Sequence, residues 1–386
     1  MKKHKLIKFS FLLASIPLVS AGAITVAISL MAKSFNNHSL SAIETLATIP
    51  SLFIIFGTLF SSFIAKKIGY KNTALIGLII CSLVGIIPAF ILDYNIIFIS
   101  RALFGLGIGL LTPSLISLIP ILFPDDVVNM IGISSAVSGV GGMSSSFIVG
   151  QLLKINWQAS FLTYGLIIPI TIIFALFTPT DKISNKNDSS EQIEEGFPLP
   201  LKYLIIIFTI LSLATPAYIS VGFKMVSIMN FNGYGSPTDA SYILTFMGLG
   251  SMIAGFSFGK ILKTLKIFTL PLAFTCLCIA MFIISSSKIV LLTIFGGLLS
   301  GFGFRLMMPT FTHYINNKKT KNSGLITSLF FALFNICSTL APNITMFVQG
   351  FSFVGSLYNL FIFYSTLFGI LAVISIFVSN KISKIL

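Results

Sequence analysis

Charged side chains are scarce in this 386-residue sequence. Lys, Arg, Asp and Glu together make up 9% of the residues, whereas soluble globular proteins carry about 25%. Hydrophobic residues make up 55%, and the mean hydropathy is +1.01. There are too few charged side chains to cover a water-facing surface of this size. The scarcity excludes an ordinary soluble protein and predicts a chain embedded in a lipid bilayer.

Metal-ligating and redox-active residues are also few. The three histidines, His4, His38 and His313, lie on different segments, so neither a metal site nor a catalytic triad is expected. The four cysteines all lie in apolar runs, which indicates buried thiols without a disulfide framework. The Gly-x4-Gly-Lys-Ser/Thr motif of nucleotide-binding loops is missing. We therefore expect no enzyme, no cofactor and no ATP-driven step, and there is no room for the soluble output domain of a receptor.

Twelve apolar runs, separated by short polar breaks, are each long enough to cross about 30 Å of hydrocarbon. The runs are continuous and do not alternate, so they indicate helices and not barrel strands. The predicted fold is an all-α membrane protein with twelve transmembrane helices. These cover residues 7–32, 40–64, 73–92, 95–122, 129–152, 157–178, 201–229, 238–262, 267–286, 289–314, 323–348 and 355–380.

The first run has a basic start and a small-residue stretch, Ser20-Ala21-Gly22-Ala23, that is typical of a cleaved signal peptide. Its apolar residues continue to Met31, beyond the usual 7–15 residue core of a signal peptide. We therefore expect a retained helix.

The formal net charge is +14, from 24 basic and 10 acidic residues. If the N-terminus is cytoplasmic, most of the basic residues fall in cytoplasmic segments, and Lys33, Lys154 and Lys288 fall in outer loops. Such asymmetry predicts that both termini are cytoplasmic. The positive charge is therefore explained by topology next to anionic lipids and does not indicate nucleic-acid binding. We expect a multi-pass, monomeric protein of a bacterial cell membrane.

The two halves of the chain resemble each other. Gly105-x-Gly107, followed by Pro113, has a counterpart in Gly301-x-Gly303, followed by Pro309. The polar segment 179–200 lies between these halves and is expected to be a flexible cytoplasmic loop. The predicted organisation is a six-helix bundle over 1–178, the loop, and a second bundle over 201–386. Parallel six-helix repeats are a transporter architecture.

The loop after the second predicted helix resembles a motif of the major facilitator superfamily, Gly-x-x-x-Asp-Arg-x-Gly-Arg-Lys. Lys67, Gly69 and Lys71 fit that pattern, whereas Lys66 stands where the family has an acid. The resemblance implies a cytoplasmic gate loop, but Lys66 cannot act as the acidic latch. The positive-inside rule alone also explains these lysines.

A second motif supports the same resemblance. Arg101, Gly105, Gly107 and Gly109 match the family's Arg-x-x-x-Gly-x-Gly-x-Gly signature. Glycines at this spacing, and Gly301 and Gly303 in the second half, allow close helix packing. Arg101 has either a coupling or structural role, or its side chain extends to the outer interface.

The antiporter motif of this superfamily is only partly present. Gly132, Gly141 and Gly150 fit its glycines, but Ser145-Ser146 stands where Gly-Pro is expected. This weakens the prediction of proton antiport without excluding it.

Ionisable residues inside a membrane span are functional candidates. Arg305 lies near the middle of its predicted helix and is the first candidate for contact with substrate, although backbone carbonyls could instead satisfy it. Glu44 is the candidate for proton coupling, since Asp239 has the position of a helix cap. Asn335 lies among several polar residues that could line a cavity. The predicted substrate or coupling residues are therefore Arg305, Arg101, Glu44 and Asn335.

The resemblance implies alternating access, in which two halves rock about a central site. We expect proton-coupled efflux of small organic compounds or drugs. The alternative is uptake or exchange of a small organic anion, as in the cyanate and nitroimidazole transporters that the chain also resembles, because cations outnumber acids within the spans. The expected partners are a small-molecule substrate and the lipid bilayer.

Overall fold

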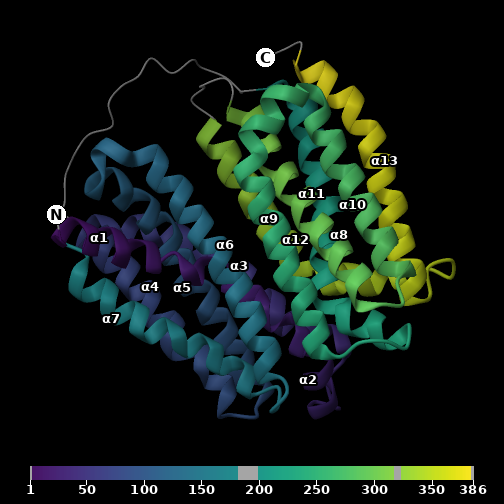
Figure 1. Ribbon diagram of the computed structural model, residues 1–386, viewed down its shortest axis with the longest axis horizontal. Coiled ribbons are helices and arrows are strands. Elements are labelled where there is room, and N and C mark those ends of the chain that lie inside the picture. The colour runs from purple at the N-terminus through teal and green to yellow at the C-terminus, as the bar shows by residue number, and fades with distance from the viewer. Residues whose placement is uncertain (1, 181–198, 317–322, 384–386) are drawn as a thin grey trace. The chain divides into compact units, whose positions relative to one another are not determined.

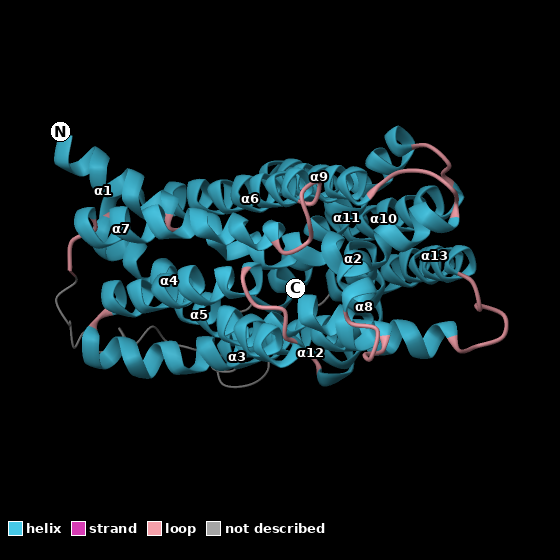
Figure 2. Ribbon diagram, turned by 90° about the horizontal axis from the view of Figure 1, so that it is seen from below, coloured by secondary structure: helices cyan, strands magenta, loops and turns pink. Residues whose placement is uncertain are grey.

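A computed structural model describes residues 2–180, 199–316 and 323–383 of the chain. Within these ranges the backbone is helical apart from short connections, and there is no β-strand (Figure 2). Most of the predicted loop over 179–200 lies outside the described residues. The prediction of an all-helical fold is confirmed.

Eleven helical stretches of the described chain are long and apolar enough to cross a membrane. One of them, Pro237–Ser286, is 50 residues long and contains two helices separated by a short 3₁₀ turn. When each helix is counted together with its adjoining 3₁₀ segments and turns, the helical runs begin and end within five residues of the predicted limits, the largest difference being a start at Lys2 instead of residue 7. The number of crossings and the side on which the termini lie remain predictions.

The chain divides into two compact units, which are described separately. Unit 1 comprises Met1–Asn185 with Pro237–Thr245, and unit 2 comprises Lys186–Ser236 with Phe246–Leu386. The elements of unit 1 (Figure 1) are α1 (Lys2–Leu13), η1 (Ile16–Ala27), α2 (Ile28–Ser34), α3 (Leu40–Ile68), α4 (Tyr70–Ile86), η2 (Ile87–Ala89), α5 (Tyr94–Leu122), η3 (Pro124–Asp126), α6 (Val127–Leu152), η4 (Ala159–Leu166) and α7 (Ile167–Phe177).

Unit 2 holds the second set of long helices. Its elements are α8 (Leu201–Phe231), most of α9 (Pro237–Leu265), η5 (Lys266–Phe268), α10 (Thr269–Ser286), α11 (Val290–Asn316), α12 (Ser323–Gln349) and α13 (Leu357–Ser383). Within this unit, α10 packs against α11 and α13, and α8 packs against α12.

Polar residues at the helix ends account for several boundaries. Ser39 precedes α3 and accepts a hydrogen bond from the backbone N–H of Ala42, and Asp93 caps α5 by accepting from that of Ile96 at 2.9 Å. Such side chains satisfy amide groups that have no partner within the helix. Gly69 separates α3 from α4 with φ of 86°, a conformation that favours glycine.

Candidate functional site

Arg101 is the most buried cation in the described part of unit 1, with 1% of its surface exposed. Its Nε donates to the carbonyl of Leu46 at 3.2 Å, its Nη1 donates to the Tyr164 hydroxyl at 3.1 Å, and its Nη2 donates to the carbonyl of Ala21 at 2.6 Å. The guanidinium also lies against the rings of Phe104 and Tyr164, at 5.2 and 5.5 Å from their centroids. The side chain does not extend to the interface but joins four segments of unit 1.

Glu44 lies in the second turn of α3 and is also 1% exposed. An acid buried inside a predicted membrane span is a candidate proton carrier, because intramembrane carboxyl groups typically mark proton pathways. Asp239 is in the first turn of α9 and only partly buried, which agrees with the position of a helix cap. Glu44 therefore remains the stronger candidate of the two.

Arg305 differs from Arg101 in burial and in hydrogen bonding. It is the sixteenth of the 27 residues of α11, counted from Val290, and its side chain is exposed. It forms neither a hydrogen bond nor an ion pair with any residue in the described ranges. An arginine at this depth faces either protein or a water-filled space, because hydrocarbon does not solvate it. Arg305 therefore offers an unpaired positive charge inside the membrane.

One aromatic side chain of α8 lies near Arg305 in unit 2. Tyr218 of α8 is within electrostatic range of the guanidinium and shares a hydrogen bond with Ser251. The ring of Tyr218 stacks on Phe304 with centroids 3.7 Å apart and an interplanar angle of 2°. Asn335 lies in α12 of the same unit, and its side-chain amide donates to the carbonyl of Phe331 at 2.8 Å. That bond leaves the amide oxygen of Asn335 able to accept from a solute.

The glycines of α5 lie where neighbouring helices approach most closely. A methyl group added at Gly105 would overlap the carbonyl oxygen of Pro50, and one at Gly109 would overlap that of Ile54, both in α3. A methyl group at Gly107 would come within 2.7 Å of the Cys81 sulfur in α4. Alternate glycines of one helix thus allow contact with two different neighbours.

Unit 2 repeats this arrangement at the corresponding positions. A methyl group at Gly301 would overlap the carbonyl oxygen of Met247 in α9, and one at Gly303 would come within 2.6 Å of the Ala273 carbonyl in α10. The third position differs, since Gly109 of unit 1 corresponds to Arg305 of unit 2. The repeat therefore keeps two packing glycines and replaces the third with the exposed cation.

Lys71 anchors the predicted gate loop to another helix. Lys67 is exposed, whereas Lys71 donates through Nζ to the carbonyl of Ala175 at 3.1 Å. Ala175 lies in the last turn of α7, where a positive charge interacts favourably with unpaired carbonyls. Lys71 thus fixes the start of α4 against the end of α7 within unit 1.

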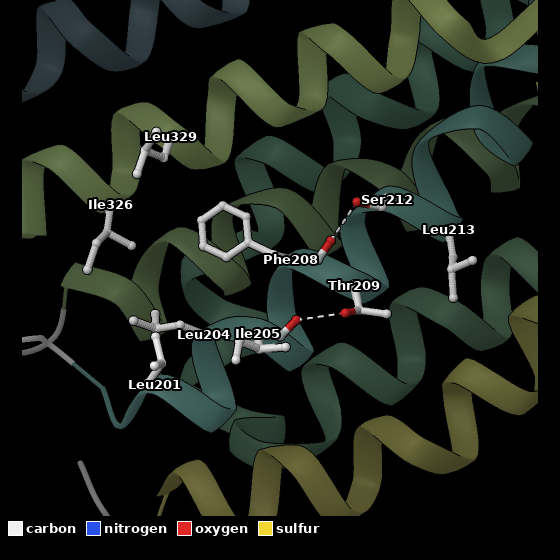
Figure 3. A pocket seen from close by; sticks show the side chains of 9 residues that line it. All are labelled: Leu201, Leu204, Ile205, Phe208, Thr209, Ser212, Leu213, Ile326 and Leu329. Carbon is white, nitrogen blue, oxygen red and sulfur yellow. Dashed lines mark hydrogen bonds between the residues drawn. The ribbon is translucent and has the colours of Figure 1, made fainter.

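A largely apolar pocket of about 490 Å³ lies between α8 and α12 in unit 2 (Figure 3). The hydroxyls of Thr209 and Ser212 donate to the carbonyls of Ile205 and Phe208 in their own helix, each at 2.9 Å. The polar groups of the wall are therefore satisfied internally, and the pocket suits an apolar group. Its lining residues are Leu201, Leu204, Ile205, Phe208, Thr209, Ser212, Leu213, Ile326 and Leu329.

The sequence indicates no role for Pro50 or Tyr164, yet the Tyr164 hydroxyl accepts a hydrogen bond from Arg101, and Pro50 lies against Gly105, one turn further along α5. The proline within the second predicted helix was a usable signal, because it leaves one carbonyl without its normal donor. The pocket of unit 2 had no such signal, since its lining residues are ordinary apolar ones.

Comparison with known proteins gives a family and a fold. The family model described as Major Facilitator Superfamily matches residues 10–342. No curated protein matches the chain at a significant level. Among solved structures, a POT peptide transporter has a TM-score of 0.76 at 12% identity, covering 98% of this chain and 95% of its own. The nucleoside transporter NupG has a TM-score of 0.74 at 12% identity, covering 97% and 99%. At such low identity, these structures show a shared fold only.

Proposed function

The chain belongs to the Major Facilitator Superfamily, and from this membership we propose that it carries a small organic anion across the membrane by alternating access. The family makes it a multi-pass membrane protein and a secondary transporter, and not an enzyme. The identity of the solute, the direction of transport and the coupling ion are the parts that we propose.

The observation that carries the proposed substrate class is the exposed, unpaired Arg305 in the middle of α11. A guanidinium presents several donors in a fixed plane and binds carboxylates and similar anions with two parallel hydrogen bonds. A solute with one anionic group would supply the partner that the described protein does not. Asn335 of the same unit could add a hydrogen bond to a neutral part of the solute.

We propose that the 50-residue stretch Pro237–Ser286 crosses the membrane twice, which gives twelve crossings in total. A continuous helix of that length would measure about 75 Å, more than twice the thickness of the hydrocarbon. The break at η5 carries Lys266 with φ of 47° and follows Lys260 and Lys263. Lysines at this turn support a cytoplasmic position for it, and the same rule supports cytoplasmic termini.

For direction and coupling, we propose export driven by a proton gradient, with Glu44 as the proton carrier. A second candidate substrate class, apolar drugs, is favoured by the apolar pocket between α8 and α12. The two classes differ in what Arg305 would contribute, since an uncharged apolar compound gains nothing from a guanidinium. They can therefore be separated by transport measurements.

The decisive experiment is solute movement in proteoliposomes that contain the purified protein. Monocarboxylates of increasing size, lipophilic cations and neutral metabolites would be compared under proton gradients of either polarity. We expect protein-dependent movement of anions and its acceleration by a gradient of one polarity. Movement of lipophilic cations alone would refute the anion proposal, and indifference to both polarities would refute proton coupling.

Replacing Glu44 with glutamine is expected to abolish the response to the proton gradient while leaving the exchange of substrate across the membrane intact. Glutamine keeps the size of the side chain but cannot release a proton. The measurement is counterflow and gradient-driven transport in the same vesicles. Asp239→Asn is the matched control, because it removes an acid at a helix start and should leave coupling unchanged. Gradient-driven transport by the Glu44→Gln variant would eliminate this residue as the proton carrier.

A further inference from the structure

Pro50 leaves a backbone carbonyl of α3 without its usual partner. In an α-helix the N–H of residue i donates to the carbonyl of residue i−4, so residue 50 would serve the carbonyl of Leu46. Proline has no N–H. Inside a membrane no water replaces the missing donor, and an unsatisfied carbonyl is strongly unfavourable. The Leu46 carbonyl instead accepts from Nε of Arg101 at 3.2 Å.

We infer that Arg101 and Pro50 act as a pair, in which the guanidinium supplies the donor that the proline lacks and also fixes the 3₁₀ segment of the first helical run. Arg101 is therefore a positioning residue for unit 1. This role differs from the substrate or coupling role that the sequence indicated, and it does not depend on the proposed function.

The 3₁₀ segment is the second part of the argument. η1 extends over 12 residues, Ile16–Ala27, whereas 3₁₀ runs longer than three or four residues are uncommon. Near its middle, Arg101 donates to the carbonyl of Ala21, and the Tyr164 hydroxyl donates to that of Ser20 at 3.3 Å. Two consecutive carbonyls are thus hydrogen-bonded from outside the segment. These bonds stabilise a backbone that its own hydrogen bonds hold poorly.

The spacing of the Arg-x-x-x-Gly motif follows from the same contact. Gly105 lies one turn after Arg101 in α5, and the missing side chain at Gly105 leaves room for the backbone of Pro50. The arginine therefore reaches the carbonyl that the proline leaves open, while the glycine allows the proline to lie against α5. One residue satisfies the hydrogen bond, and the other makes the approach possible.

Unit 2 provides an internal comparison in which both members of the pair are missing. The residue that lies against Gly301 is Met247, where unit 1 has Pro50, and the residue four positions before Gly301 is Gly297, where unit 1 has Arg101. Tyr364 in α13, 200 positions after Tyr164 of the last helical run of unit 1, also has a hydroxyl partner, but this partner is Thr345 at 3.1 Å.

The helices of unit 2 differ accordingly. α8, the first helix of this unit, is α-helical throughout Leu201–Phe231, and its last helix, α13, is α-helical throughout Leu357–Ser383. In unit 1 the corresponding runs contain η1 and η4. The long 3₁₀ segments thus occur in the unit that has the Arg101–Pro50 pair and not in the described residues of the unit that lacks it.

A double-mutant cycle tests the pair in the full-length protein. Arg101→Leu is compared in the wild-type background and in a Pro50→Ala background, where residue 50 regains an N–H for the Leu46 carbonyl. Thermal unfolding in detergent is followed by fluorescence of Trp157, the single tryptophan, which lies in unit 1 and donates to Ser34. We expect Arg101→Leu to lower Tm, and the decrease to be less than half as large in the Pro50→Ala background. Arg101→Lys should not substitute for arginine, because one ammonium group cannot reach all three acceptors.

The control background is Pro216→Ala in α8 of unit 2, which should leave the effect of Arg101→Leu unchanged. Equal decreases in the wild-type and Pro50→Ala backgrounds would overturn the inference. If Arg101→Leu yields folded protein only together with Pro50→Ala, the pair is supported. If it yields none in either background, Arg101→Gln replaces it in the cycle under the same criterion.

Hydrogen exchange tests the effect of Arg101 on η1. In Arg101→Gln, backbone exchange should be faster than in wild type at residues 20–27 and unchanged at residues 210–220. Unchanged exchange at residues 20–27 would refute the inference that Arg101 fixes η1.

Discussion

Replacing Gly105 or Gly301 with alanine is expected to remove most of the folded protein. At each position the added methyl group would overlap a backbone carbonyl oxygen of the adjacent helix, that of Pro50 or Met247. Backbone atoms within packed helices cannot move aside as a flexible side chain can, so the helices must separate. Overpacking of this kind lowers the free energy of unfolding by about 1–3 kcal/mol and occasionally more. Because the overlap is with backbone atoms, we expect both variants to lie at the upper end of that range.

The measurement is the yield of detergent-solubilised protein in size-exclusion chromatography, and its Tm from the amount of folded protein that remains in the same peak after heating. Gly132→Ala and Gly139→Ala in α6, and Gly255→Ala in α9, are matched controls because no atom lies within 4 Å of the added methyl group. Alanine forms helices better than glycine by about 1 kcal/mol, so the controls should equal or exceed wild type. Equal losses at packed and open positions would show that glycine flexibility, and not close packing, is what these helices need.

The helices could be predicted from the sequence because a membrane helix satisfies its own backbone and needs only a long apolar run. The twofold repeat of glycines likewise identified α5 and α11 as packing helices, since a missing side chain matters wherever two backbones meet. The internal conformation of the first run was not predictable in this way. η1 receives hydrogen bonds from Arg101 and Tyr164, which lie 80 and 144 positions away from their acceptors, Ala21 and Ser20. Hydropathy along the chain does not predict contacts between residues so far apart in sequence.

Arg101 and Arg305 have different surroundings that their positions in the sequence do not reveal. Both lie within predicted helices, and depth along the helix ranks Arg305 first as a substrate contact but leaves a structural role open for either residue. Their surroundings separate them, because Arg101 has three protein partners and is buried, whereas Arg305 is exposed without a hydrogen bond in the described chain. A saturated guanidinium stabilises structure, and an open one can bind a solute. Only tertiary contacts distinguish these roles.

Replacing Arg305 with glutamine is expected to weaken the binding of anionic solutes about 10- to 100-fold. A hydrogen bond to a charged group contributes about 1.5–3 kcal/mol, and each 1.4 kcal/mol corresponds to a tenfold change in Kd. Arg305 forms no hydrogen bond or ion pair within the described residues, so its removal should leave Tm near the wild-type value. The measurement is Kd for the transported anion by competition in proteoliposomes, with Tm of the same preparation.

Two further variants separate charge from geometry at this position. Arg305→Lys keeps the positive charge but loses the planar pair of donors, so an intermediate Kd is expected if the solute is bound through two parallel hydrogen bonds. Lys288→Gln removes the same charge from the segment between α10 and α11. It should leave Kd unchanged, because Lys288 is exposed before the start of α11, 17 positions from Arg305, and salt screens exposed charges. An anion Kd that is the same in Arg305→Gln and wild type, in protein with an unchanged Tm, would exclude Arg305 from the binding site. The proposed anionic substrate class would then lose its main support, and apolar compounds that occupy the pocket between α8 and α12 would become the better candidate.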